Sequence, residues 1–267
     1  MTPGWTSRTT WAAHGERTGP LVVKARGGEF PYEKTAWSAA QLPLLGARGY
    51  PVPTIIWHGM ARDQWHLTVQ SRLPGVPVTA LDEGLLDEVL ALVERQADAA
   101  IPAGDRDFTG YIANVLFDDW DEVWADAGRA GGAAGPLCAR IRRWLEPVWG
   151  LRLPPTDFAH NDLNLSNILT DGRQITGVVD WDEFSLGSRA LDLVVLALDA
   201  ERLGAAGAAD RLLSAADSAV GAAGLRCLIS YRTLAALAED TREGLQPQAD
   251  IQATTAILDR LPSTLAG

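Results

Sequence analysis

The chain has 267 residues, of which 47% are hydrophobic and 21% are charged, and its formal net charge is −11 at pH 7. This composition supports a packed core and excludes a disordered chain, and the acidic balance argues against a nucleic-acid-binding protein. Its two cysteines, Cys138 and Cys227, exclude a disulfide framework and a cysteine-based zinc site. We see neither an apolar run of the roughly 18 residues that cross a bilayer nor a signal peptide, and expect a cytoplasmic protein without membrane partners.

The first seventy residues predict a small sheet with one helix. Their β-branched and apolar runs are typical of strands, and one segment with helical spacing is closed by Gly46 and Gly49. A breaker rich in proline and glycine at residues 73–77 divides the chain into domains of residues 1–74 and 75–267. In chain order we predict a strand over 21–25, a helix over 33–45, strands over 51–57 and 65–70, and a turn region over 58–63.

The sequence after this boundary predicts mostly helices. Apolar side chains recur at helical spacing from Leu81 to Val93, with acidic residues on the opposite face. One motif-dense stretch of β character, residues 157–192, lies between the helices, and we expect the chemistry there. The predicted helices cover 81–93, 137–149, 191–203, 208–222, 225–238 and 251–261, with a Gly/Ala loop at 128–136.

Charge is distributed unevenly along the chain. Residues 1–72 contain eight basic and four acidic residues, whereas residues 79–126 contain two basic and thirteen acidic residues. This asymmetry indicates two surfaces, one suited to phosphates and the other to a cation. The alternative is that acidic helices only keep the protein soluble.

The stretch from 158 to 182 contains the motif His-x-Asp-x4-Asn, followed by a turn and an apolar strand that ends in aspartate. Its polar members are His160, Asp162, Asn167 and Asp180. Magnesium takes a few carboxylate or amide oxygens and fills its remaining positions with phosphate and water. Phosphoryl transfer to a hydroxyl needs that metal, a cation on the phosphates and a group that accepts the hydroxyl proton. The motif therefore predicts a phosphoryl-transfer site.

Together with Lys24 and the Pro74-Gly75 pair, this motif resembles the aminoglycoside phosphotransferase family of small-molecule kinases. The resemblance runs from about Gly4 to about residue 200. It implies an α+β, bilobal, protein-kinase-like fold with a small N-terminal antiparallel-sheet lobe and a larger, mostly helical C-terminal lobe. The family usually has glycine where this chain has Asn161, and an acid where it has Ser188.

The resemblance also implies roles for the motif residues. Asp162 would be the catalytic base that orients the acceptor hydroxyl, and His160 would hold the catalytic loop in shape. Asn167 and Asp180 would bind Mg²⁺, and Asp192 would brace the catalytic loop.

A nucleotide site is implied in the first 73 residues. Lys24 would bridge the α- and β-phosphates, with Glu33 as the likeliest partner that positions it, in competition with Glu29. Each of these residues can also be an ordinary surface charge. The same resemblance places a phosphate-covering loop at Ser7 and Arg8 and the purine-binding hinge at Gln70 and Arg72.

We therefore expect an ATP- or GTP-dependent, magnesium-dependent O-phosphotransferase whose acceptor is a hydroxyl-bearing small molecule, such as a cationic antibiotic in a resistance reaction. Acids lining a cleft concentrate a cationic ligand, although the same acids can simply be solvated. The alternatives are a metabolic kinase for choline-, homoserine- or sugar-like substrates and a non-catalytic kinase-like binding module. The sequence decides neither ATP against GTP nor the oligomeric state. The candidate substrate-binding acids are Asp118, Asp119, Asp182 and Glu183.

Overall fold

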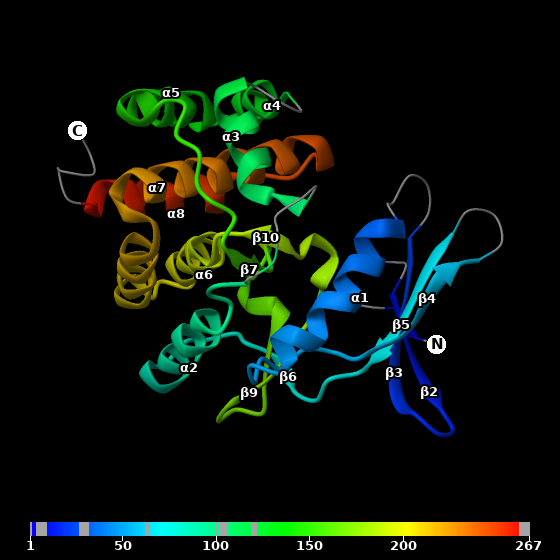
Figure 1. Ribbon diagram of the computed structural model, residues 1–267. Helices are drawn as coiled ribbons and strands as arrows, with labels where there is room; N and C mark the ends of the chain where they lie inside the picture. The colour runs from blue at the N-terminus through cyan, green and yellow to red at the C-terminus, as the bar shows by residue number, and fades with distance from the viewer. Residues whose placement is uncertain are drawn as a thin grey trace. The chain divides into compact units, whose positions relative to one another are not determined.

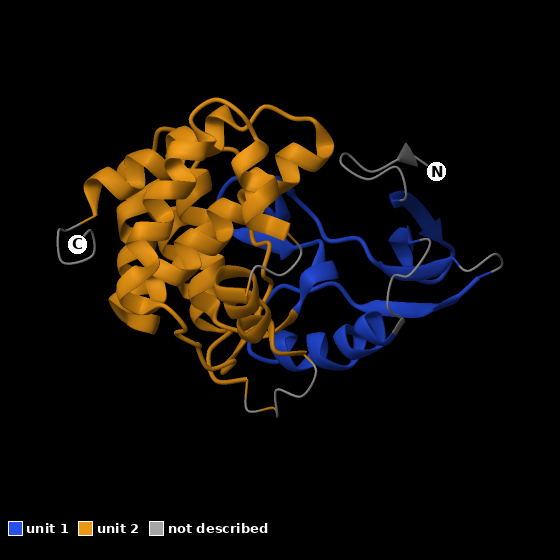
Figure 2. Ribbon diagram, turned by 90° about the horizontal axis from the view of Figure 1, so that it is seen from above, with its two compact units in different colours: residues 1–78, 166–184 blue, residues 79–165, 185–267 orange. Residues whose placement is uncertain are grey.

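The computed structural model describes residues 2–3, 10–26, 32–61, 65–99, 101, 106–118 and 122–261. The chain divides into two compact units (Figure 2). The first contains residues 1–78 and 166–184, and the second contains residues 79–165 and 185–267.

The segment 166–184 belongs to the first unit, although the sequence places it beyond the predicted boundary at residue 74. Backbone pairing is the physical reason, because strand β8 (Ile168–Thr170) pairs with β6 (Val76–Pro77). The Thr176 hydroxyl also donates to the Pro74 carbonyl at 2.7 Å. The middle of the motif-rich stretch is thus built into the N-terminal unit.

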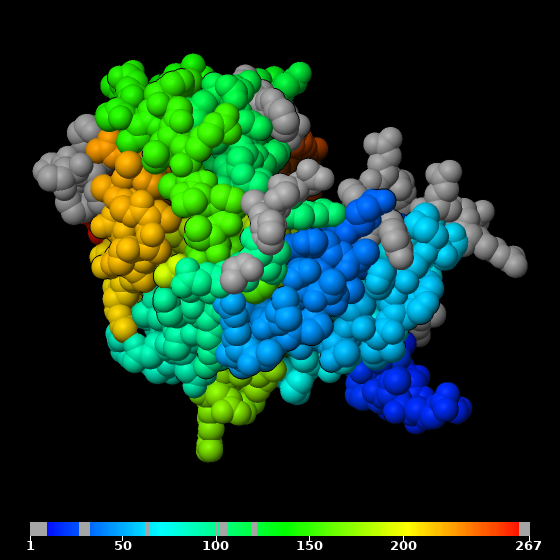
Figure 3. Space-filling view, viewed as in Figure 1, coloured from blue at the N-terminus to red at the C-terminus, as the bar shows by residue number. Residues whose placement is uncertain are grey.

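The first unit contains a five-stranded antiparallel sheet of order β1-β2-β3-β5-β4, one long helix and a three-stranded sheet of order β6-β8-β9 (Figure 1). The space-filling view shows α1 and β4 side by side at the surface (Figure 3). The elements not yet bounded are β1 (Thr2–Pro3), β2 (Thr10–Gly15), β3 (Gly19–Arg26), α1 (Tyr32–Gly46), β4 (Ile55–Met60), β5 (His66–Ser71), η5 (Leu165–Asn167, which ends in this unit), β9 (Ile175–Val178) and η6 (Trp181–Glu183).

Strand β3 lies inside the five-stranded sheet and carries Lys24. It pairs with β2 on one side and β5 on the other, so that Lys24 lies between Thr10 and Thr68. The strand predicted over 21–25 and the helix predicted over 33–45 are therefore confirmed.

Strand β4 differs from its prediction. It begins at Ile55 rather than at residue 51 and continues to Met60, through part of the predicted turn region. Pro51 and Pro53 have no backbone N–H for a sheet ladder, which explains the late start. The Pro51 carbonyl instead accepts a hydrogen bond of 2.8 Å from Val178 N and so joins the two sheets.

The second unit is mainly helical and encloses its own apolar core, and the sheet found in its described residues has two strands, β7 and β10. The two helices predicted over 208–222 and 225–238 are confirmed as the two parts of α7, between which Gly221 has a non-helical φ of 69° and ψ of 168°. The loop predicted over 128–136 is shorter in the structure, because α4 ends at Arg129 and α5 begins at Ala134. The helices are α2 (Glu83–Glu94), α3 (Phe108–Asp118), α4 (Val123–Arg129), α5 (Ala134–Leu145), η4 (Glu146–Val148), α6 (Arg189–Arg202), α7 (Ala206–Glu243) and α8 (Gln248–Arg260), and the strands are β7 (Asp157–Ala159) and β10 (Ser185–Gly187).

By length and composition alone, α7 could cross a membrane. Half of its most apolar window is buried inside the second unit, where α7 packs against α4 and α6. Burial of this kind is typical of the core helix of a globular unit.

Gly75 supplies a backbone conformation that other residues adopt only with strain. Its φ is +104°, and a Cβ there would lie 2.8 Å from the Thr170 carbonyl oxygen and against the Thr176 hydroxyl. We expect Gly75→Ala to lower the free energy of unfolding by about 1–3 kcal/mol in urea denaturation. The control is Gly128→Ala in α4, where nothing lies within 4 Å, and which should leave stability unchanged or raise it by up to about 1 kcal/mol. Equal stabilities of the two variants would contradict this account.

Candidate active site

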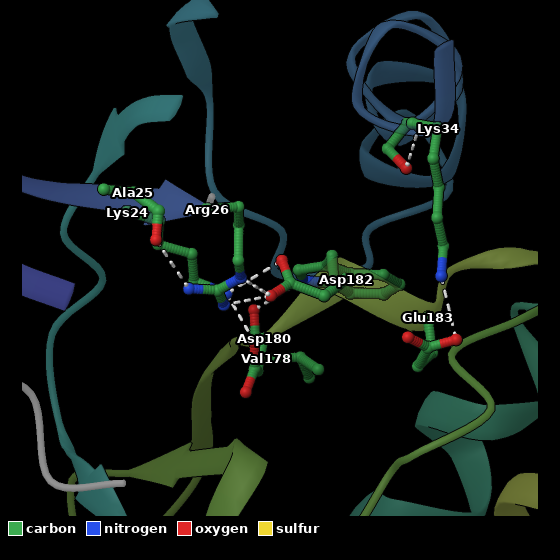
Figure 4. A network of polar contacts seen from close by, with 10 residues as sticks. Lys24, Ala25, Arg26, Lys34, Val178, Asp180, Asp182 and Glu183 are labelled. Atoms are coloured by element: carbon green, nitrogen blue, oxygen red, sulfur yellow. Dashed lines mark hydrogen bonds and ion pairs between the residues drawn. The ribbon is translucent and has the colours of Figure 1, made fainter. Parts of the chain in front are cut away.

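Lys24 is a buried cation of the first unit. Its side chain is only 10% exposed, and its ammonium group donates to Asp180 and, at 3.1 Å, to Asp182 Oδ1 (Figure 4). An ammonium ion removed from water is destabilising unless carboxylates and hydrogen bonds compensate it. The two aspartates therefore account for a buried lysine at this position of the sheet.

The segment that supplies these carboxylates is fixed by Trp181. The indole N–H donates to the Val178 carbonyl at 2.9 Å, and the ring packs edge-on against Tyr50 and Phe184. Asp180 precedes this anchor with φ 65° and ψ 57°, a left-handed conformation that is rare for aspartate and typical of strained functional positions. A core tryptophan thus holds the acids on both sides of it against β3.

Two further cations pair with the same segment. Arg26 contacts Asp182 Oδ2 through Nη2 and through Nε, the latter at 3.1 Å, and Lys34 of α1 donates to Glu183 at 2.8 Å (Figure 4). Burial raises the pKa of Asp182, but the charges of Lys24 and Arg26 outweigh that effect and hold the pKa below its ordinary value. Asp182 is therefore an ionised, internally paired carboxylate.

The structure places Lys24 against carboxylates other than Glu33, its expected partner, and the competing Glu29 lies outside the described residues. Glu33 is the only acid of α1, and it is exposed in the first turn of that helix. A cavity of about 20 Å³ lies beside Lys24, and the part of α1 that lines it is not acidic. The carboxylates come from the 180–182 segment instead, because that segment is built into the same unit. The α1 residues that line this cavity are Lys34, Thr35, Ser38 and Leu42.

Asn167 and Asp180 lie in the same unit and are joined through the backbone. Val179 N, adjacent to Asp180, donates to the Asn167 carbonyl at 2.9 Å. Their donor set of one carboxamide and one carboxylate oxygen fits Mg²⁺, which takes one or two carboxylates together with substrate phosphates. Among the described residues, no group of three or more His, Cys, Asp or Glu side chains could hold a metal ion. The site is therefore chemically suited to a metal shared with a phosphate ligand.

The remaining residues predicted for the nucleotide are only partly placed. Gln70 is buried in β5 and lines the same cavity as Lys24. Arg72 is exposed, and its backbone N–H donates to the Pro20 carbonyl at 3.0 Å, so this amide is already used within the sheet. Ser7 and Arg8 lie outside the described residues.

In the second unit, Asp192 holds the loop that follows β7. This fully buried carboxylate accepts hydrogen bonds from the backbone N–H groups of His160 and Asn161, both at 2.8 Å, and from Gln96 Nε2 at 3.0 Å. Burial raises the pKa of Asp192, and the charge of His160 and these donors oppose the shift. This carboxylate therefore fixes the backbone of the first two residues of the loop.

Asn161 occupies the position where the family resemblance predicts glycine. Its φ is 68°, in the left-handed region that glycine adopts without cost and that asparagine tolerates better than most residues. Its side-chain amide donates to Ser185 Oγ at 2.7 Å. The departure from the family pattern thus preserves the backbone conformation and adds a bond to β10.

Asp162, the predicted base, is 43% exposed. Asn164 Nδ2 lies 3.4 Å from its Oδ2, and the guanidinium of Arg232 on α7 lies 3.8 Å from its Oδ1. Sequence reasoning missed Arg232, which lies far along the chain. It also missed Asp199, which accepts from Leu165 N at 2.8 Å and could have been found two helical turns after Asp192 on the same face.

Three of the acids predicted to bind a cationic substrate have cation partners within the chain. Asp182 and Glu183 are paired as described above, and Asp118 lies 3.7 Å from Arg152. Asp119 lies outside the described residues. Acids of α2 are paired as well, since Arg211 binds both Glu83 and Asp87. At least three of the thirteen acids of residues 79–126 are therefore paired with arginines of the chain itself.

Residues 2–228 of the chain match the model of the phosphotransferase enzyme family. The chain belongs to this family. A curated relative, hygromycin-B 4-O-kinase of Escherichia coli, is 27% identical over 158 residues, which cover 51% of this chain and 44% of the relative. The match therefore spans less than half of that relative's length.

Solved structures of related phosphotransferases share the fold. A thermostable mutant of aminoglycoside phosphotransferase APH(4)-Ia has a TM-score of 0.64 at 16% identity, covering 96% of this chain and 93% of its own. Phosphotransferase APH(3'')-Id from Streptomyces rimosus, in complex with ADP and streptomycin, has a TM-score of 0.60 at 16% identity, covering 82% and 88%. The predicted fold, with a small antiparallel-sheet lobe and a larger helical lobe, is confirmed.

The raised pKa of Asp192 predicts how pH affects stability. Because the unfolded carboxyl, with a pKa of about 3.9, ionises before the folded one, the contribution of Asp192 to stability falls as pH rises above about 4. We expect the unfolding free energy of the wild-type protein, relative to Asp192→Asn, to decrease as pH rises above about 4 in urea titrations. A relative stability that increases over this range would show that the folded pKa is lowered instead.

Proposed function

We propose that the protein transfers the γ-phosphoryl group of a magnesium-bound nucleoside triphosphate to a hydroxyl of a small molecule. The observation that carries this proposal is the buried Lys24, held against Asp180 in the same unit as Asn167. This combination supplies a phosphate cation and two oxygen ligands for the metal. The intact set also disfavours a non-catalytic binding module.

Each unit has its own part in the proposed reaction. In the first, Asn167 and Asp180 would hold Mg²⁺, which neutralises phosphate charge when bound, and Lys24 would bind phosphate oxygens. In the second, Asp162 would accept the proton of the acceptor hydroxyl and orient its oxygen, while Asp192 keeps the loop in place. Catalysis in this scheme depends on positioning and charge neutralisation more than on a strong base.

The acceptor we propose is a hydroxyl-bearing aminoglycoside, phosphorylated in a cytoplasmic resistance reaction. The support is the resemblance to hygromycin-B 4-O-kinase and to phosphotransferases whose structures contain hygromycin B or streptomycin. The internal pairing of Asp118, Asp182 and Glu183 removes much of the support that the acidic residues alone gave. Structures of relatives contain AMP-PNP, ADP or GDP, so ATP and GTP both remain candidate donors.

The test is transfer of labelled γ-phosphate from ATP or GTP, with Mg²⁺, to hygromycin B, streptomycin, choline, homoserine and sugars, each product identified by mass. We expect a phosphorylated aminoglycoside, and Asp162→Asn should lower its turnover at least about 100-fold while nucleotide affinity stays within about twofold. The control is Asp171→Asn in the exposed β8–β9 turn. Product from choline or a sugar alone would favour the metabolic kinase, and unchanged turnover in Asp162→Asn would contradict the role of this residue.

A further inference from the structure

We propose that Arg26 is a second phosphate-binding cation of the nucleotide site, and that Asp182 is the positioning residue that sets Arg26 and Lys24 side by side. The inference rests on the proposed function and assigns residues that the motif pattern does not include.

The placement of the two cations follows from strand geometry. Lys24 and Arg26 are two residues apart on β3, and alternate residues of a strand point to the same face. Both reach the Asp182 carboxylate, Lys24 at Oδ1 and Arg26 at Oδ2, each with an N–O distance of 3.1 Å (Figure 4). One carboxylate thus uses a separate oxygen for each cation.

Asp182 can act as an anchor because its own position is fixed. It lies in η6 directly after Trp181, whose ring is held by Tyr50 and Phe184. The cations are therefore aligned from the core of the unit rather than by a carboxylate on α1.

The charge balance of this cluster favours a phosphate ligand. Lys24 and Arg26 face two carboxylates, Asp180 and Asp182, so the four groups are neutral together. A divalent cation bound at Asp180 leaves an excess of positive charge beside them, which attracts a polyphosphate. The Arg26 side chain is 22% exposed against 10% for Lys24, so it is the more accessible of the two side chains.

An arginine suits this place chemically. A guanidinium presents several N–H donors in one plane and can bind a carboxylate and a phosphate oxygen together, whereas lysine is a point charge. Replacing Arg26 by lysine should therefore restore only part of the affinity that glutamine removes.

The first experiment measures the affinities of ATP, ADP, AMP and adenosine by calorimetry, with Mg²⁺, for the wild-type protein, Arg26→Gln and Arg26→Lys. We expect Arg26→Gln to lower the affinity for ATP at least about tenfold and to leave the affinity for adenosine within about twofold of the wild-type value. The ATP affinity of Arg26→Lys should lie between those of the wild-type protein and Arg26→Gln. The control is Arg173→Gln, which removes the same charge from the exposed β8–β9 turn of the same unit. Melting temperatures establish that each variant is folded.

Two results would overturn the inference. If Arg26→Gln lowered the affinities for ATP and adenosine equally, Arg26 would act only through the fold. If the affinity for ATP were unchanged, Arg26 would not contact phosphate. Both differ from a failure of the proposed function, in which the wild-type protein itself binds no nucleotide and the inference fails with it.

A second variant tests Asp182 separately. Asp182→Asn removes a negative charge beside the phosphates, so the affinity for ATP should not weaken, whereas kcat should fall at least about tenfold because the cations lose their common anchor. Asp171→Asn is the matched control. Unchanged kcat in Asp182→Asn, or a loss of ATP affinity with kcat retained, would contradict the positioning role.

Discussion

The pairing of the buried Lys24 ammonium with Asp180 and Asp182 is the interaction on which the first unit depends. The Lys24 side chain is nine-tenths buried, and a buried ammonium ion is destabilising unless carboxylates and hydrogen bonds compensate it. This requirement joins β3 to the segment after β9. Together with the pairing of β8 with β6, it holds residues 166–184, far along the chain, in one unit with the first 78 residues.

The second unit also contains a buried ionisable group, Asp192, that holds a backbone segment. Asp192 is a buried carboxyl group that accepts hydrogen bonds from N–H groups of His160, Asn161 and Gln96. In both units a buried ionisable group fixes a backbone segment and leaves a more accessible carboxylate beside it. Asp180 is 42% exposed and Asp162 is 43% exposed, whereas the groups that hold their segments are almost or fully inaccessible. Catalysis by positioning requires carboxylate oxygens that a ligand can reach and a rigid backbone that holds them in place.

The sequence was sufficient to find the motif and to predict most helices and strands, because both depend on local patterns. Strand β3, helix α1 and the motif from His160 to Asp180 follow from short-range spacing and alternation. The late start of β4 could also have been predicted from the local sequence, because proline has no backbone N–H to donate to a sheet ladder.

The charge pairing could not be predicted in the same way. Lys24 has two nearby candidates in sequence, Glu29 and Glu33, yet the carboxylates that it contacts, Asp180 and Asp182, are 156 and 158 residues away. Arg26 and Arg232 belong to no motif and become relevant only when folding places them against Asp182 and Asp162. The excess of acids in residues 79–126 predicted a surface for cations. Composition alone cannot show which of these acids already have arginine partners in the folded chain.

The most direct test of this account is a crystal structure with Mn²⁺ and AMP-PNP, in which anomalous scattering locates the metal. The account predicts Mn²⁺ between the side-chain oxygens of Asn167 and Asp180, with Lys24 on the phosphates and still in contact with Asp182. A metal bound elsewhere, or phosphates that do not contact Lys24, would contradict it.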